Sequence, residues 1–135
     1  MANDRIVIDV MGGDHAPDVV LDGVALVCNP ESELHVDPSR LILVGDETVT
    51  REGLRTRACT SSVAVQHAAE VIGMDEKPGV ALRAKPGASI PIGVGCVRAG
   101  EAGAFISMGN TGAVVGAATL GLGTLEGIRD RKSVV

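Results

Sequence analysis

Residues 108–112, MGNTG, combine residue types that hold anions in proteins. They follow an apolar run and precede a segment of small residues, which is typical of a strand that enters a helix. A turn of this kind directs backbone N–H groups outward, here around Gly109 and Gly112. Asn110 or Thr111 could cap the helix or donate a hydrogen bond to an oxyanion. Capping without a ligand explains the same spacing equally well.

A second glycine turn, residues 11–14 (MGGD), follows the first apolar run. Gly12 and Gly13 would let the backbone approach a ligand beside Asp14, but they also suit a tight turn with positive φ. The dinucleotide fingerprint G-x-G-x-x-G is incomplete, and Pro17 stands at the helix entry, which disfavours a nicotinamide-dependent dehydrogenase. Taken alone, this segment favours a purely steric turn.

Cationic side chains gather in residues 81–89, ALRAKPGAS. Arg83, Lys85 and Ser89 are the residue types that make phosphate contacts, although exposure to solvent is the commoner fate of such charges. The spacing does not fit the P-loop pattern G-x-x-x-x-G-K-[ST]. Acidic pairs at 46–47 and 75–76 could bind a metal or exchange protons, and helix N-terminal charge explains them equally well.

Hydrophobic periodicity predicts alternating strands and helices around these segments. Strands are predicted at residues 5–10, 41–44, 61–68 and 104–108. Helices are predicted at 17–28, 48–57 and 111–125, as one turn within 69–79, and on either side of KPGAS within 80–100. This alternation predicts a parallel sheet covered on both faces, with ligands at the carboxyl ends of its strands. Three turns fall at those ends, at 12–14, 45–47 and 109–112.

Composition excludes several classes of function. The formal net charge is −5 and Phe105 is the single aromatic residue, so nucleic acid is not expected as a partner. Cys28, Cys59 and Cys96 are widely spaced, which fits neither a disulfide framework nor a zinc site and suits a reducing cytoplasm. The N-terminus lacks the pattern of a secretory signal. The uncharged stretch 105–125 is long enough to span a membrane, but its turn and glycines favour a buried strand, turn and helix.

The ordered set MGGDHAP, LVGDE, VIGMDEKP, ALRAKPGAS, SMGNTGA and LEGI closely resembles the bacterial phosphate acyltransferase (PlsX) family of fatty acid and phospholipid synthesis. The match runs from residue 5 to about residue 128. The resemblance implies a three-layer α/β/α fold with a mostly parallel sheet, related to isocitrate dehydrogenase and phosphotransacetylase. It also implies a cytoplasmic homodimer at the membrane face, although no amphipathic anchor is visible and peripheral membrane contact stays open.

Three departures from the family pattern stand out. Met108 replaces an alanine, and Ala88 precedes Ser89 where the family has two serines. The family also continues with a long second portion after GI, whereas this chain continues with RDRKSVV. We therefore expect residues 1–128 to form an incomplete N-terminal α/β portion and residues 129–135 a charged, disordered tail.

The activity that the resemblance implies is transfer of an acyl group from acyl carrier protein to inorganic phosphate. Geometry and resemblance together assign catalysis to Asn110, Lys85 and Ser89, with the amide and the hydroxyl donating to the oxyanion. Phosphate would be held by the backbone of 109–112 and by Lys85 or Arg83, with the MGGD turn as another wall. No metal and no organic cofactor is indicated. The alternative is a non-catalytic remnant that only folds or dimerises.

Overall fold

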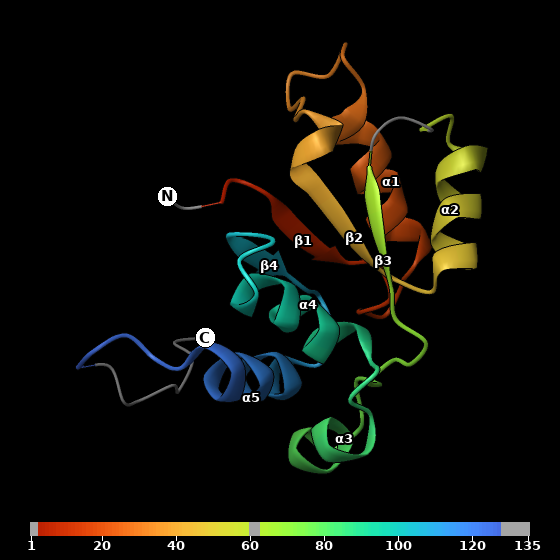
Figure 1. The fold of residues 1–135 in the computed structure, drawn as a ribbon. Helices are drawn as coiled ribbons and strands as arrows, with labels where there is room; N and C mark the ends of the chain where they lie inside the picture. Colours follow the sequence, from red (N-terminus) through yellow and green to blue (C-terminus); the bar gives the residue numbers. More distant parts are fainter. Residues whose placement is uncertain (1–2, 60–62, 128–135) are drawn as a thin grey trace.

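The computed structural model describes residues 3–59 and 63–127, and it is a sheet between two layers of helices (Figure 1). The sheet is four-stranded and parallel, with strand order β3-β2-β1-β4. Its strands are β1 Ile6–Asp9, β2 Leu41–Gly45, β3 Ala64–His67 and β4 Ala104–Ile106. The helices are α1 Asp18–Cys28, α2 Glu47–Thr56, α3 Pro78–Ala84, α4 Ser89–Arg98 and α5 Thr111–Leu122, with a 3-10 turn at Pro38–Arg40. The predicted layered α/β fold is confirmed.

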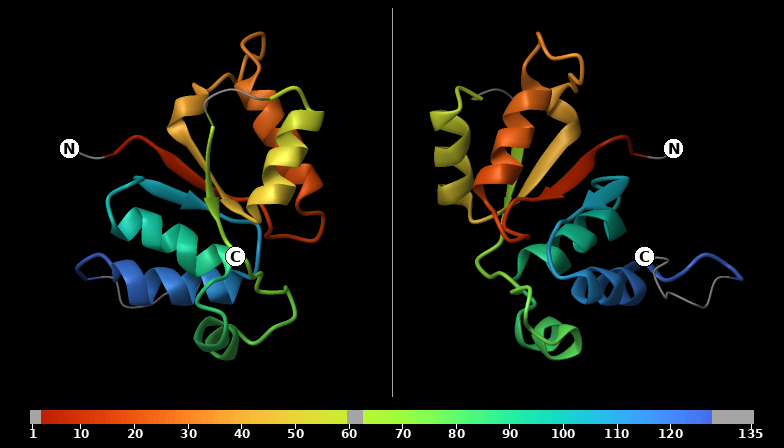
Figure 2. Two further views of the ribbon diagram at one scale, coloured as in Figure 1. Left: turned by 45° about the vertical axis from the view of Figure 1, so that its right-hand side comes forward. Right: turned by 180° about the vertical axis from the view of Figure 1, so that it is seen from behind.

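The two faces of the sheet bury different clusters of side chains. On one face, Leu41 and Leu43 pack with Leu21 and Val24 of α1 and with Leu54 of α2. On the other face, Val7, Ile42 and Val44 pack with Cys96 of α4. Helices α3 and α5 lie beyond α4 and share a third cluster with it, as the views of Figure 2 show. Because both of its faces are covered, β2 is apolar and buried at every position.

Two differences between the predicted and the observed elements stand out. Helix α5 ends at Leu122 rather than residue 125, because Gly123 takes φ +77° and its N–H donates to the Thr119 carbonyl. The predicted turn of helix within 69–79 is wrong: that segment is a loop with a tight turn, and α3 begins at Pro78. The predicted boundary at residue 128 and the predicted tail lie outside the described residues.

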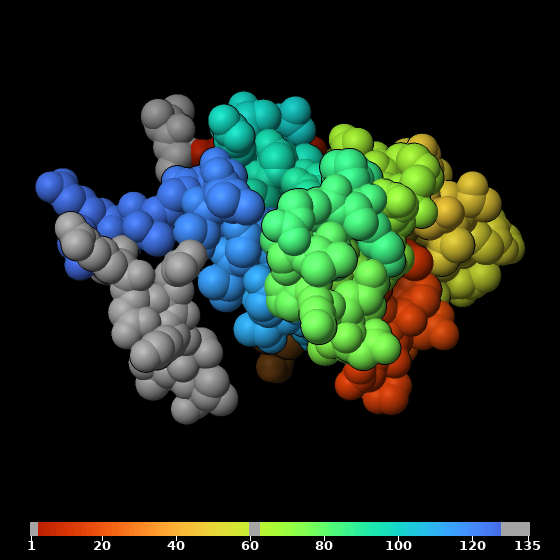
Figure 3. All heavy atoms as spheres, turned by 90° about the horizontal axis from the view of Figure 1, so that it is seen from below, coloured from red at the N-terminus to blue at the C-terminus, as the bar shows by residue number. Residues whose placement is uncertain are grey.

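The strand order places β4 on the opposite side of β1 from β2 and β3. The carboxyl ends of β1 and β4 therefore flank the point where the strand order reverses, which is the usual ligand position in open α/β sheets. Figure 3 views the molecule from this edge, where the turn after β1 (red), the start of α5 (blue) and α3 (green) gather. Within the described residues, no helix has the length and apolar character needed to cross a membrane.

Candidate active site

A buried carboxylate joins the turn after β1 to the turn after β4. Asp9, the last residue of β1, is 1% exposed. Its Oδ1 accepts the N–H groups of Met11 and Gly12, each at 3.0 Å, and its Oδ2 accepts the Ser107 hydroxyl at 2.8 Å. The Ser107 Oγ in turn accepts the N–H of Gly109 at 3.0 Å. One continuous network therefore fixes both turns at the point where the strand order reverses.

The glycines of these turns allow the two backbones to meet. A Cβ at Gly12 would collide with the Asp9 carboxylate and lie 3.0 Å from the Gly109 Cα. Gly13 has φ +112°, a conformation that glycine adopts without steric cost. The steric interpretation of MGGD is therefore supported, while ligand contact stays a prediction. Beside the turn lies a cavity of about 230 Å³, lined by residues 12–16, Val19, Val20 and Met108.

Asn110 holds the start of α5 against a neighbouring loop. Its Oδ1 accepts the Ala113 N–H at 3.1 Å, which caps the helix. Its Nδ2 donates to the carbonyls of Gly73 at 3.0 Å and Glu76 at 2.8 Å. Both amide hydrogens are thus engaged and the residue is buried. Asn110 acts here as a positioning residue, and its donation to an oxyanion stays a prediction.

The first turn of α5 offers backbone donors at the molecular surface. Thr111 and Gly112 are exposed, and among residues 3–59 and 63–127 neither N–H donates to a protein acceptor. The start of a helix carries partial positive charge, so these groups attract anions. A Cβ at Gly112 would collide with the ring of Pro78, so glycine here allows α3 to approach α5.

Lys85 makes hydrogen bonds to the same loop, residues 71–76, that Asn110 contacts. Its Nζ donates to the Val71 carbonyl at 2.9 Å and to Oε2 of Glu76 at 2.8 Å. The hydrogen bond from Lys85, and then that from the Gly73 N–H, holds the pKa of Glu76 below its ordinary value of 4.5. Lys85 therefore connects to Asn110 through this loop, and a direct phosphate contact remains a prediction.

The other two residues of the cationic segment take different positions. Arg83 lies exposed on α3. Ser89 is 1% exposed at the first position of α4, and its N–H donates to the Glu70 carbonyl at 3.1 Å. A Cβ at Gly109 would lie 3.4 Å from Cδ1 of Ile90, the next residue of α4. The start of α4 therefore reaches the turn after β4.

Comparison with known proteins identifies the family. A family model described as "Fatty acid synthesis protein" matches residues 4–135. The chain belongs to this family.

Relatives named phosphate acyltransferase share 41% identity with it in Methylococcus capsulatus, 43% in Pelotomaculum thermopropionicum and 42% in Alkalilimnicola ehrlichii. Each alignment covers 96% of this chain but only 36 or 37% of the relative. The predicted resemblance is confirmed, and the chain spans little more than a third of the length of these relatives.

Three residues around these turns were not among the candidates from the sequence. Asp9 and Ser107 form the network between the turns, yet each looked like an ordinary strand-end polar residue. Lys77 is exposed and directly precedes Pro78, whose ring lies against Gly112 in the first turn of α5. No ion pair involves Lys77 in the described part of the chain. No local sequence pattern marked Lys77 as a candidate.

Three of the four residues in the acidic pairs have structural partners. Asp46 caps α2 by accepting the Val49 N–H at 2.9 Å, and Glu47 pairs with Arg51 at 3.0 Å. Glu76 is held by Lys85, as described above. Across residues 3–59 and 63–127, no group of three or more His, Cys, Asp or Glu side chains has the geometry to hold a metal ion.

Proposed function

We propose that this chain carries the phosphate-holding part of a site that transfers a fatty acyl group from acyl carrier protein to inorganic phosphate, giving acyl phosphate. The observation that carries the proposal is the pair of backbone N–H groups without a protein acceptor at Thr111 and Gly112, two exposed residues at the reversal point of the described sheet. Relatives aligned over these same residues are named phosphate acyltransferase, which supports this choice of reaction.

The reaction depends more on the positioning of phosphate against the thioester than on base catalysis. Phosphate is already an anionic nucleophile near neutral pH, so one of its oxygens can attack the thioester carbonyl carbon directly. The tetrahedral intermediate then collapses, and the carrier protein leaves as a thiolate. The enzyme has to hold one anion and stabilise a second, which backbone N–H groups and a nearby ammonium can do. The start of α5 and Lys77 supply these two kinds of group.

The three residues assigned to catalysis from the sequence act differently in this proposal. Asn110 and Lys85 hold the loop of residues 71–76 against α5, so they keep the N–H groups of the helix start in place. Ser89, at the start of α4, remains the candidate hydroxyl donor to the oxyanion. Arg83 remains an outer cation that attracts phosphate. The MGGD turn forms the wall opposite α5.

The proposal includes the partners that the full reaction needs. Acyl carrier protein supplies the acyl group, a second copy of the chain completes a homodimer, and the protein works in the cytoplasm beside the membrane surface. The remaining length of the relatives would complete the cleft, because this chain aligns with only 37% of one of them.

A non-catalytic chain is the second candidate, and β4 is the observation that favours it. Among the described strands β4 is an edge, with Ala104 exposed and Ile106 49% exposed, and Met108 just beyond it is 54% exposed. An unpaired edge with an uncovered apolar face invites association. In this version the chain folds and self-associates but transfers no acyl group.

One assay separates the two candidates. The chain is incubated with acyl-acyl carrier protein and phosphate, and acyl phosphate is trapped with hydroxylamine, with the Methylococcus capsulatus relative as positive control. Product from both proteins supports the transferase proposal for this chain. Product from the relative but none from this chain supports the non-catalytic candidate. Lys77→Met should weaken the phosphate dependence, whereas Arg98→Met, a cation at the end of α4, should leave it unchanged.

A further inference from the structure

Two cysteines that are far apart in sequence meet between α1 and α2. Cys28 is the last residue of α1, and Cys59 follows the end of α2. They are 8% and 7% exposed, and both belong to the hydrophobic cluster that covers this face of the sheet. Both line the same cavity, and the neighbouring Cys59 contributes to the raised pKa of the Cys28 thiol. Cys96, the third cysteine, is buried in the cluster on the opposite face.

The end of α2 fixes the direction of the second thiol. The Cys59 N–H donates to the Leu54 carbonyl at 2.9 Å, and the Ala58 N–H donates to the Arg55 carbonyl at 3.1 Å. These two bonds, with Ala58 at φ +54°, form a Schellman motif. The motif ends α2 and fixes the backbone at Cys59, whose side chain packs in the same hydrophobic cluster as Cys28.

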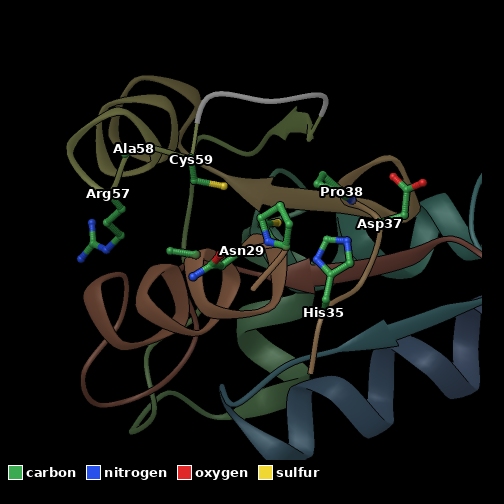
Figure 4. A pocket seen from close by; sticks show the side chains of 10 residues that line it. Asn29, His35, Asp37, Pro38, Arg57, Ala58 and Cys59 are labelled. Carbon is green, nitrogen blue, oxygen red and sulfur yellow. The ribbon is translucent and has the colours of Figure 1, made fainter. Parts of the chain in front are cut away.

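A cavity of about 700 Å³ opens beside the thiols, and both cysteines line it. Figure 4 shows Asn29, His35 and Asp37 on its walls together with Cys59. The volume falls within the range of pockets that admit drug-sized molecules. The cavity therefore gives a small reagent a path to a pair of sulfurs that are themselves almost completely buried.

This cavity is separate from the candidate active site. Helix α1 begins beside the carboxyl ends of the strands and ends with Cys28, and residues 37–38 of the cavity wall lead directly into β2. The thiols therefore lie toward the amino ends of the strands. The inference that follows is independent of the proposed transferase function.

We propose that Cys28 and Cys59 close into an intramolecular disulfide when the chain meets a low-molecular-weight disulfide such as oxidised glutathione. One cysteine thiolate attacks a glutathione sulfur, forming a mixed disulfide and releasing one glutathione. The other cysteine thiolate attacks the protein sulfur of that mixed disulfide and releases the second glutathione. The two cysteine protons end on the two released glutathione thiols, so the protein is oxidised by two electrons and the reagent is reduced by two.

Burial of the thiols slows this reaction. Desolvation, followed by the neighbouring Cys59, raises the pKa of the Cys28 thiol to about 11. The thiol is therefore protonated near neutral pH, and only the rare thiolate reacts. The pair is expected to close over a sustained change in redox conditions rather than in a rapid burst. In a reducing solution it persists as two thiols.

The test uses the whole chain and its third cysteine as an internal control. After incubation with excess oxidised glutathione, intact mass and free thiols in denaturant are measured. The wild-type chain should lose two hydrogens in mass and keep one thiol of three. Cys96→Ala should lose the same two hydrogens and keep none. Cys28→Ala should form no intramolecular disulfide, and any thiol that reacts should exchange its hydrogen for one glutathionyl group, which raises the mass.

A peptide map of the wild-type chain gives an answer even if a variant fails to fold. Trypsin places the three cysteines in peptides 6–40, 58–83 and 84–98, because Lys77 and Lys85 precede prolines and are not cleaved. The proposal predicts a crosslink between peptides 6–40 and 58–83 of one chain, which dithiothreitol reverses. Three free thiols after oxidation, a crosslink through Cys96, or a crosslink between two chains would overturn it.

Discussion

Replacing Asp9 by asparagine tests the network that joins the two turns. The carboxylate is 1% exposed and accepts three hydrogen bonds, from Met11, Gly12 and Ser107. An asparagine oxygen can keep the two backbone bonds, but its NH₂ group then faces the Ser107 hydroxyl. That hydroxyl already accepts the Gly109 N–H, so its own hydrogen loses a buried acceptor. Bonds to a charged acceptor are also stronger than bonds to an amide.

The expected loss in the free energy of unfolding follows from these contacts. One buried unsatisfied group costs about 1–3 kcal/mol and the weakened bonds add to it, so Asp9→Asn should lose about 2–4 kcal/mol. Urea unfolding should be followed by far-ultraviolet circular dichroism, because the chain contains neither tryptophan nor tyrosine. Ser107→Ala should couple to Asp9→Asn by about 0.5–3 kcal/mol in a double-mutant cycle. Strict additivity, or a loss below about 0.5 kcal/mol for Asp9→Asn, would refute the network.

Three further predictions concern stability, each measured by urea unfolding. Gly12→Ala should lower the free energy of unfolding by about 2–4 kcal/mol, because the new Cβ would collide with a buried carboxylate. Gly23→Ala, which has open space around it in α1, should raise the free energy of unfolding by about 0.5–1 kcal/mol. Equal effects of the two substitutions would contradict the described packing. Ala58→Gly should raise the free energy of unfolding by about 0.5–1 kcal/mol, because glycine adopts φ +54° without strain. A lower free energy of unfolding would argue against that conformation. The pKa of Glu76 is lowered from 4.5 in the folded chain, chiefly by Lys85. The ionised carboxylate therefore stabilises the folded state fully above pH 4.5, and this stabilisation is lost as the pH falls through the lowered pKa. The difference in the free energy of unfolding between the wild-type chain and Lys85→Met should shrink over this pH range. A difference that stays constant would exclude the Lys85–Glu76 ion pair.

Local pattern was enough to predict most of the fold. The apolar run LILV became β2, and Asn110 before small residues became the cap of α5. Turns at strand ends could be placed on one edge because parallel strands share their direction. The end of α5 was missed by three residues, since the pattern stayed apolar beyond the glycine at 123 that ends the helix.

Long-range partners could not be predicted from the sequence. Asp9 and Ser107 are separated by 98 residues, and only the adjacency of β1 and β4 brings them together. Lys85 looked free to bind phosphate because nothing local revealed its bond to Glu76. The meeting of Cys28 and Cys59 depends on how α1 and α2 pack on the sheet. Such pairs follow from topology rather than from spacing along the chain.

The central claim is that the carboxyl edge between β1 and β4 holds phosphate. The most direct measurement is a titration of the ¹⁵N-labelled chain with inorganic phosphate, monitored by amide chemical shifts, with chloride at matched ionic strength as control. We predict saturable shifts at Thr111 and Gly112, smaller shifts at Gly12 and Gly13, and none around Cys28. Unchanged amides at the start of α5, or shifts equally strong with chloride, would contradict the account.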